Sequence, residues 1–252
     1  MTASSLGKQL SELGFHFAAD NLDDVVARAT KQRWGAVELL GYLATEESSA
    51  RARRGVERRL SSSKLGRMSP MANFDWGWPT RIDRGAVESA LKLEFLEGAR
   101  NVVLIAPQGL GKTMVAQNIA HQAILKGHSA LFTTASSMLL DLGAQESART
   151  LDTRLKHYAR PSVLVVDEVG YLSYDSRNAD LLFQVVSRRY ENKSLVLTTN
   201  LHFGDWANVF PNAGCATALI DRIVHHADVI TIEGKSFRRR EAETTKAKRA
   251  KA

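Results

Sequence analysis

The residues best suited to chemistry lie in the stretch from Ala106 to Thr113, where two glycines precede a lysine and a threonine. Gly109 and Gly111 permit a turn whose backbone N–H groups point at phosphate oxygens, and a helix that begins there adds its positive dipole. Lys112 can reach the β- and γ-phosphates of ATP, and the Thr113 hydroxyl can ligate Mg²⁺. The spacing therefore predicts a nucleotide site at Pro107, Gln108, Gly109, Leu110, Gly111, Lys112, Thr113 and Met114. Ala106 stands where this pattern usually has its first glycine. The position ends a strand, and an extended backbone tolerates the methyl group of alanine.

Two adjacent acids, Asp167 and Glu168, follow the apolar run Val163–Val166 farther along the chain. Asp167 suits the outer coordination shell of Mg²⁺, so we predict that Thr113 and Asp167 hold the metal ion. Glu168 suits polarising a water for attack on the γ-phosphate. Asn200 ends the next apolar run and could hydrogen-bond that water or the phosphate, although a plain turn residue is the alternative.

Apolar runs alternate with helical patterns from residue 84 to residue 232, which predicts an α/β fold with a mostly parallel sheet flanked by helices. The expected strands cover residues 102–105, 129–133, 163–166, 195–199 and 229–232. The expected helices cover residues 84–98, 114–125, 151–160, 178–190 and 217–226. Ligands bind at the carboxyl ends of such strands. The phosphate loop, the acid pair and Asn200 all follow strands, so we expect them to meet.

Residues 6–60 have helical periodicity and predict a small unit of three or four helices. The unit ends in a strongly basic run, which consists of Arg51, Arg53, Arg54, Arg58, Arg59, Lys64 and Arg67. Arg51, Arg54 and Arg58 share one helical face. We interpret the run as a surface that contacts DNA phosphates; a solvated charged face is the alternative.

Residues 61–80 have the composition of a linker. Phe74, Trp76 and Trp78 alternate within it, which suits an extended segment packed on a core; covering the base of a nucleotide is the alternative. The expected organisation is a basic helical domain over residues 1–68, a nucleotide-binding domain over 69–238 and a disordered basic tail over 239–252.

The chain of 252 residues has a formal net charge of +7, which favours an acidic partner such as nucleic acid. Its single cysteine, Cys215, excludes an internal disulfide framework and fits a reducing compartment. The sequence has neither the pattern of a signal peptide nor an apolar run long enough to cross a membrane. We therefore expect a cytoplasmic protein with no membrane partner.

The order of phosphate loop, acidic strand, strand-final asparagine and arginine-bearing helix is that of the AAA+ ATPases, which the chain resembles. The resemblance narrows to the IstB family, the ATPases encoded beside the transposase in bacterial insertion sequences and related to the helicase loader DnaC. It rests on DEVGYLSYDSRNADLLFQVVSRRYE (Asp167–Glu191), TTNLHFGDWANVF (Thr198–Phe210), ALIDRIVHH (Ala218–His226) and GKSFR (Gly234–Arg238).

The resemblance implies an ATPase that assembles as an oligomer on double-stranded DNA, remodels its target and recruits or stimulates a cognate transposase. A DnaC-like replicative helicase loader is the alternative. The resemblance also implies catalytic roles for Glu168, Asn200 and Arg222, the last as an arginine finger that reaches the nucleotide of a neighbouring subunit. Arg188 and Arg189 are alternative fingers, and Arg238 is a weak candidate for the sensor-two arginine.

His225 and His226 are the remaining residues with metal-binding chemistry. Adjacent residues on a helix face different ways, and the sequence offers no partner ligands at zinc spacing. We therefore expect no metal ion at these histidines.

Overall fold

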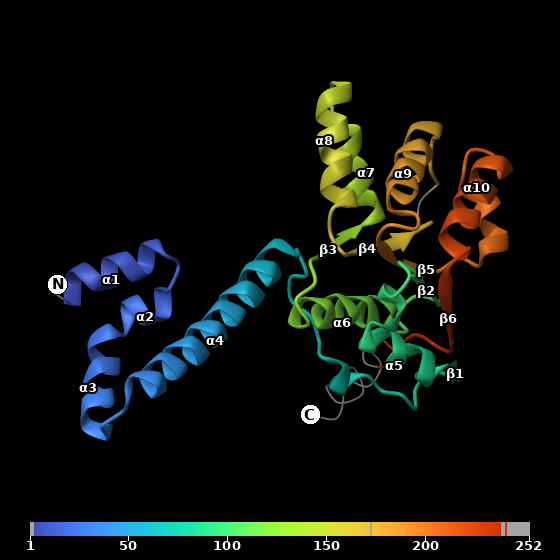
Figure 1. Cartoon of the computed structure of the whole chain (residues 1–252). Helices are drawn as coiled ribbons and strands as arrows, with labels where there is room; N and C mark the ends of the chain where they lie inside the picture. The colour runs from blue at the N-terminus through green and yellow to red at the C-terminus, as the bar shows by residue number, and fades with distance from the viewer. Residues whose placement is uncertain (1–2, 172, 238–239, 241–252) are drawn as a thin grey trace, which may run out of the picture. The chain divides into compact units, whose positions relative to one another are not determined.

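The computed structural model describes residues 3–171, 173–237 and 240. The chain divides into two compact units, Met1–Arg58 and Arg59–Ala252. The first unit is helical, as predicted (Figure 1). Its helices are α1 (Ala3–Glu12), α2 (His16–Asp20), α3 (Leu22–Gln32) and α4 (Ala36–Ser62), the last of which continues into the second unit.

The second unit is built on a six-stranded sheet with the order β1-β6-β2-β5-β4-β3. The strands are β1 (Arg81–Ile82), β2 (Asn101–Ile105), β3 (Ala130–Thr134), β4 (Val163–Val169), β5 (Ser194–Thr199) and β6 (Ala227–Glu233). Strands β2 to β6 pair in parallel, and β1 pairs antiparallel with β6 at the edge. The central strands are apolar and buried on both faces, which is typical of a parallel sheet covered by helices.

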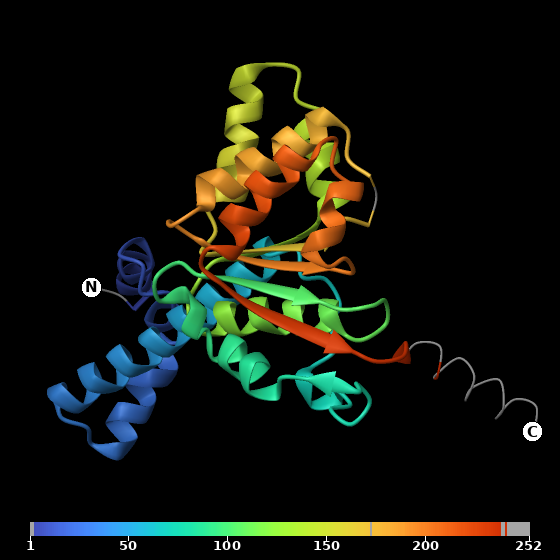
Figure 2. The same ribbon diagram turned by 90° about the vertical axis from the view of Figure 1, so that its right-hand side faces the viewer.

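Helices cover both faces of this sheet (Figure 2). They are α5 (Arg84–Lys92), α6 (Lys112–Leu125), α7 (Ala135–Gly143), α8 (Ala148–Ala159), α9 (Ser176–Arg189) and α10 (Ala213–Val224), with short 3-10 turns at Met71–Asn73, Glu94–Leu96 and Phe203–Asn208. Helices α5 and α6 lie on one face; α7, α9 and α10 lie on the other, with α8 packed on α7 and α9. The predicted mostly parallel α/β sheet is therefore confirmed.

One expected helix is shorter than predicted, and one strand was not predicted. The helix expected over residues 84–98 ends at Lys92, because Leu93 takes a left-handed conformation with φ 71°. This bend allows both Leu93 and Phe95 to be buried. Strand β1 was not predicted, because its two residues are too few to show a periodicity.

The residues just after Arg58 pack closely within the second unit. Ser63 is fully buried, and its carbonyl accepts a hydrogen bond from Phe132 N at 2.7 Å. The carbonyl of Leu65 accepts from Gln117 Nε2 at 3.1 Å. The boundary expected after residue 68 thus falls inside the second unit.

Candidate functional site

The phosphate loop joins β2 to α6. Gly109 and Gly111 have φ angles of 80° and 87°, in the left-handed region that favours glycine. A Cβ atom on Gly111 would lie 2.7 Å from the Phe74 ring, and one on Gly109 would collide with the side chain of Ser236. The loop therefore holds this shape only with glycine at both positions.

Lys112 is the first residue of α6 and is nearly buried. Its Nζ donates hydrogen bonds to the carbonyls of Ala106 at 2.5 Å and Pro107 at 3.0 Å, so the ammonium lies within the loop. Ala106 itself continues the strand, since its N–H donates to the Thr199 carbonyl at 3.1 Å. This extended backbone accommodates the alanine, as expected.

Asp167 and Glu168 occupy an irregularity in β4. The register between β4 and β5 shifts between Val166 and Val169, where β4 has one extra residue. Glu168 has a φ of 60°, an uncommon conformation for a residue with a side chain and one that clusters at functional sites. A bulge of this kind redirects side chains: Asp167 is buried, whereas Glu168 is exposed.

Hydroxyl groups from two other segments hold this acid pair in place. The Asp167 carboxylate accepts from Thr113 Oγ1 at 3.0 and 3.2 Å and from Thr198 Oγ1 at 2.5 Å. Thr198 also accepts from the Glu168 backbone N–H at 3.0 Å. Thr198 was not predicted as a site residue, because its role depends on β5 lying beside β4, and the order of strands cannot be read from the sequence.

The oxygen atoms around Asp167 fit a magnesium ion. The Thr113 hydroxyl and the Asp167 carboxylate lie together beside the phosphate loop, and Mg²⁺ prefers such oxygen ligands. Asp167 is only 3% exposed, and its carboxylate accepts hydrogen bonds from the Thr113 and Thr198 hydroxyls. A bound divalent cation would add positive charge beside this buried carboxylate.

A cavity of about 370 Å³ opens over the loop, within the size range of ligand sites. Its lining combines residues from distant parts of the chain: Gln108, Gly109, Leu110, Gly111, Lys112, Thr113, Met114, Glu168 and Asn200, with Phe74, Trp78 and Phe237 among the others. Of the residues predicted to hold the nucleotide or the metal ion, Pro107 and Asp167 do not line the cavity but contact Lys112 and Thr113, which do. The predicted convergence of loop, acid pair and asparagine is thus present.

The aromatic residues of the linker both pack and line this cavity. The Phe74 ring is buried and lies 4.8 Å from that of Trp76, which does not line the cavity. Trp78 meets Phe237 at 6.0 Å, and its Nε1 donates to the Lys235 carbonyl at 2.7 Å. The two roles that the sequence left open, packing and lining a nucleotide site, are therefore compatible.

The segment after β6 returns to the phosphate loop. Phe237 N donates to the Gly109 carbonyl at 2.9 Å. Arg240 pairs with Asp75 at 3.3 Å and lies 4.4 Å from the centre of the Trp78 ring. Segments from both ends of the second unit thus border the cavity. The predicted sensor-two candidate Arg238, and the predicted tail at residues 239 and 241–252, lie outside the described residues.

The predicted DNA-binding arginines and lysine have different surroundings. Four are exposed without a side-chain ion pair in the described chain: Arg51, Arg53, Arg58 and Arg67. Arg51 donates to the Gly14 carbonyl at 3.3 Å, and Arg59, which is half-buried, donates to the Ile124 carbonyl at 3.3 Å. Lys64 is exposed; burial raises the pKa of Asp141, but the hydrogen bond from Arg154, with smaller contributions that include the charge of Lys64, brings it below its usual value.

Arg54 has a structural partner. It pairs at 2.8 Å with Glu47, whose carboxylate is buried and also accepts from the backbone N–H groups of Phe17 and Ala18. Burial raises the pKa of Glu47. The hydrogen bonds from Arg54, Ala18 and Phe17 together lower it by more than burial raises it, so the pKa lies below its usual value. Arg54 therefore neutralises a buried acid in the helical unit.

The three candidate arginine fingers are also placed differently. Arg222 is half-buried on α10, with its guanidinium 4.4 Å from the centre of the Phe183 ring. Arg188 is exposed and pairs with Asp152 at 2.8 Å. Arg189 is only 1% exposed. Its guanidinium donates to the carbonyls of Tyr158, Ala159, Pro161, Ser162 and Ser194. Arg189 therefore cannot contact a neighbouring subunit, so the prediction of Arg189 as an alternative arginine finger was wrong.

The two adjacent histidines do not behave as helical neighbours. Helix α10 ends at Val224, so both rings follow its last turn and lie 4.0 Å apart. His225, His226 and Glu191 each present a ligand atom within 4.8 Å of the other two. The prediction that the histidines face different ways was therefore wrong, because the helix ends two residues earlier than expected.

The profile of the IstB-like ATP binding protein family matches residues 8–245. The chain belongs to this family. It is 32% identical over 232 residues to the putative ATP-binding protein of insertion sequence IS21 from Pseudomonas aeruginosa, covering 92% of this chain and 88% of that protein. It is 34% identical over 220 residues to the corresponding IS232 protein from Bacillus thuringiensis subsp. berliner, covering 87% and 88%.

Solved structures of replication proteins share the AAA+ fold of this family member. AMPPCP-bound DnaA from Aquifex aeolicus superposes with a TM-score of 0.56 at 18% identity, covering 68% of this chain and 52% of that chain. The DnaC helicase loader superposes with a TM-score of 0.50 at 17% identity, covering 70% and 99%. Within the described residues, no helix is both long and apolar enough to span a membrane.

Proposed function

We propose that this IstB-like protein is an ATPase that binds double-stranded DNA as an oligomer and assists a cognate transposase. The main support for ATPase activity is the arrangement of Thr113, Asp167 and Glu168 beside one cavity. Thr113 comes from the phosphate loop, and Thr198 holds both acids. The relatives are named as ATP-binding proteins of insertion sequences, which supports the link to transposition.

Each residue of the site has a role in this proposal. The loop N–H groups and Lys112 bind the phosphates, while Thr113 and Asp167 would hold Mg²⁺, which when bound would supply positive charge to the phosphoryl oxygens. Glu168, exposed at the cavity, accepts a proton from the attacking water, and Asn200 orients that water or the γ-phosphate. Phe74 and Trp78 border the space for the rest of the nucleotide.

The DNA-binding part of the proposal rests on charge. Arg51, Arg53 and Arg58 are exposed on α4, in a chain of net charge +7. Guanidinium groups on such a surface bind phosphates irrespective of sequence. An oligomer completes the proposal, because an arginine finger that acts in trans needs a neighbouring subunit. The transposase partner is proposed from the names of the relatives, which belong to insertion sequences.

The test separates nucleotide binding from DNA binding. Lys112→Ala should lose ATP binding, because the phosphates lose the charge that the loop encloses, and its DNA binding without nucleotide should persist. Imaging of the wild-type protein on duplex DNA with ATP, with ADP and with neither should show assembly that depends on the nucleotide. Normal ATP affinity in Lys112→Ala would refute the assigned site.

A helicase loader is the second candidate function, and the similarity to the fold of the DnaC helicase loader favours considering it. A loader would act on a replicative helicase and contact single strands. Competition between single-stranded and duplex DNA, together with co-purification of either a transposase or a replicative helicase with the tagged protein, distinguishes the two. Preference for single strands and capture of the helicase would replace the transposition proposal.

A further inference from the structure

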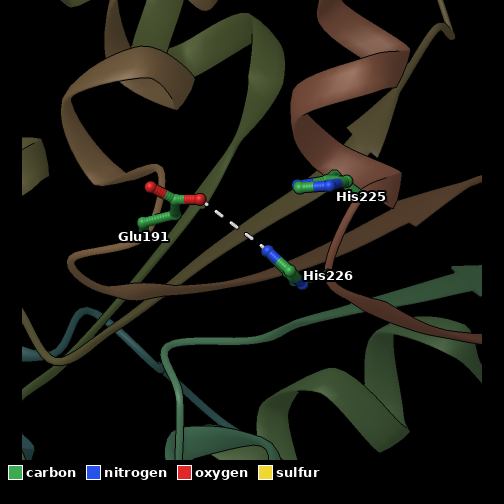
Figure 3. Close-up of side chains that lie close together, drawn as sticks. All are labelled: Glu191, His225 and His226. Atoms are coloured by element: carbon green, nitrogen blue, oxygen red, sulfur yellow. Dashed lines mark ion pairs between the residues drawn. The ribbon is translucent and has the colours of Figure 1, made fainter.

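Glu191, His225 and His226 form a cluster on the second unit, away from the residues that line the nucleotide cavity. Figure 3 shows the three side chains directed toward one another, Glu191 from the segment after α9 and the histidines from the segment after α10. Glu191 Oε1 lies 3.8 Å from His226 Nε2. We propose that this cluster is a binding site for a divalent transition metal ion, with Zn²⁺ as the fitting example.

The donor set suits zinc. Two imidazoles and one carboxylate are ligands that Zn²⁺ accepts together, with water in the remaining position. At metal–ligand distances of about 2.1 Å, tetrahedral ligands lie about 3.4 Å apart. The three ligand atoms already lie within 4.8 Å of one another. The side chains of His226 and Glu191 are 47% and 59% exposed, so small rotations can close the remaining gap.

The surroundings of the cluster also favour a cation. Helix α9 ends at Arg189 and helix α10 ends at Val224, so two helix C-termini, each with partial negative charge, lie next to the cluster. Two arginines of the adjoining helices have partners outside the cluster: Arg222 lies over Phe183, and Arg188 pairs with Asp152.

Two further details indicate that the ligands are held. The Tyr190 hydroxyl lies 2.8 Å from His225 Nδ1. When that nitrogen carries the proton, the ring donates to Tyr190 and leaves Nε2 available for a metal ion, an arrangement that is common around metal-bound histidines. Glu191 itself takes a left-handed backbone conformation with φ 56°, which is sparsely populated for residues with side chains and recurs at ligand sites.

The direct test is metal binding by the full chain without a histidine tag. The protein is first treated with EDTA and dialysed, and Zn²⁺ alone is then titrated in the absence of nucleotide against a competing chromophoric chelator. We expect one tight equivalent that Mg²⁺ does not displace, because Mg²⁺ prefers oxygen ligands. Replacement by Co²⁺ should give the visible absorption of a site with nitrogen and oxygen ligands.

Variants connect the binding to these side chains. His225→Ala, His226→Ala and Glu191→Gln should each weaken Zn²⁺ binding more than about tenfold, and Tyr190→Phe should weaken it about tenfold by freeing the His225 ring. His128→Ala, which alters an exposed histidine outside the cluster, is the matched control and should bind like the wild type. Circular dichroism checks that each variant is folded.

The outcomes are decisive in both directions. The absence of a saturable equivalent in the wild-type protein would overturn the proposal, as would wild-type affinity in His226→Ala. The test uses neither ATP nor DNA, so its result is independent of the proposed ATPase and transposition functions.

Discussion

The two acids at the end of β4 are neighbours in the chain but face different environments. Asp167 is buried among hydroxyl groups, where it suits a metal ion. Glu168 is exposed at the cavity, where it suits a proton transfer. In a regular strand of a sheet covered by helices, successive side chains point to opposite faces and both would be buried. The left-handed backbone of Glu168 instead leaves its carboxylate accessible.

The first prediction concerns Glu168. Glu168→Gln keeps the size of the side chain and removes its ability to accept a proton. Turnover of ATP should fall by a factor of at least about 100, the usual contribution of a general base, while ATP affinity stays close to that of the wild type. Steady-state phosphate release and equilibrium nucleotide binding measure the two quantities. Turnover within a few fold of wild type would remove Glu168 from its assigned role.

The second prediction concerns Thr198, which positions other groups and does not line the nucleotide cavity. Thr198→Val removes the hydroxyl that bonds Asp167 and the Glu168 backbone. The Mg²⁺ concentration for half-maximal ATPase activity should rise about 10- to 100-fold, as for other groups that orient metal ligands. Thr198→Ser restores the hydroxyl and should restore the Mg²⁺ dependence; a serine variant as impaired as the valine would indicate a packing role instead.

At the scale of elements, sequence patterns predicted the central strands and most helices because those segments are long and consistently apolar or amphipathic. They also predicted that Lys112, Glu168 and Asn200 meet, since each follows a parallel strand. Three features could not be predicted from these sequence patterns. Thr198 depends on strand order, the bulge depends on the register of two strands, and the histidine cluster depends on where α10 ends.

The third prediction concerns the basic face of α4. Arg51 and Arg58 share a face and are exposed, whereas Arg54 must be left intact because it neutralises buried Glu47. Arg51→Glu with Arg58→Glu should weaken binding to all duplex sequences alike. The log–log slope of affinity against salt should become less negative by about 0.9 for each phosphate that the variant no longer neutralises.

The control for this charge reversal changes the same net charge elsewhere. Arg149→Glu with Arg160→Glu alters two exposed arginines outside the basic run. Fluorescence anisotropy with two unrelated duplexes, at several salt concentrations, compares the variants. An equal decrease of affinity in both pairs would mean that only overall charge matters, and the run on α4 would be an ordinary solvated face.

At the scale of the whole molecule, the proposed ATP hydrolysis depends on contact between neighbouring subunits. Lys112 supplies positive charge to the nucleotide bound by its own chain. We propose that Arg222 supplies a second positive charge to the nucleotide of the neighbouring subunit. Arginine fingers contribute roughly 10³- to 10⁵-fold to turnover. Hydrolysis per subunit should therefore rise with protein concentration and with DNA that promotes assembly.

The fourth prediction is that Arg222 acts on a neighbouring subunit. Arg222→Ala should bind ATP almost normally yet hydrolyse little. Mixed with Lys112→Ala, which has an intact arginine but an impaired loop, it should regain part of the activity, because some neighbours then form a complete site. Light scattering verifies that the two variants assemble together. If the co-assembled mixture stays inactive, Arg188 becomes the candidate, since Arg189 is buried.

The hydrogen bond from Phe237 to Gly109 has a consequence for how the protein responds to proteases. The segment around Trp78 and the segment around Phe237 are far apart in the chain, yet both border the nucleotide cavity and are linked by the bond from Trp78 to Lys235. A nucleotide in the cavity should therefore tighten both segments at once. Under limited chymotrypsin digestion, ATP should slow cleavage after Trp76, which lies in the first segment and precedes Gly77, and after Phe237 in parallel, while cleavage after the exposed Leu13 continues unchanged.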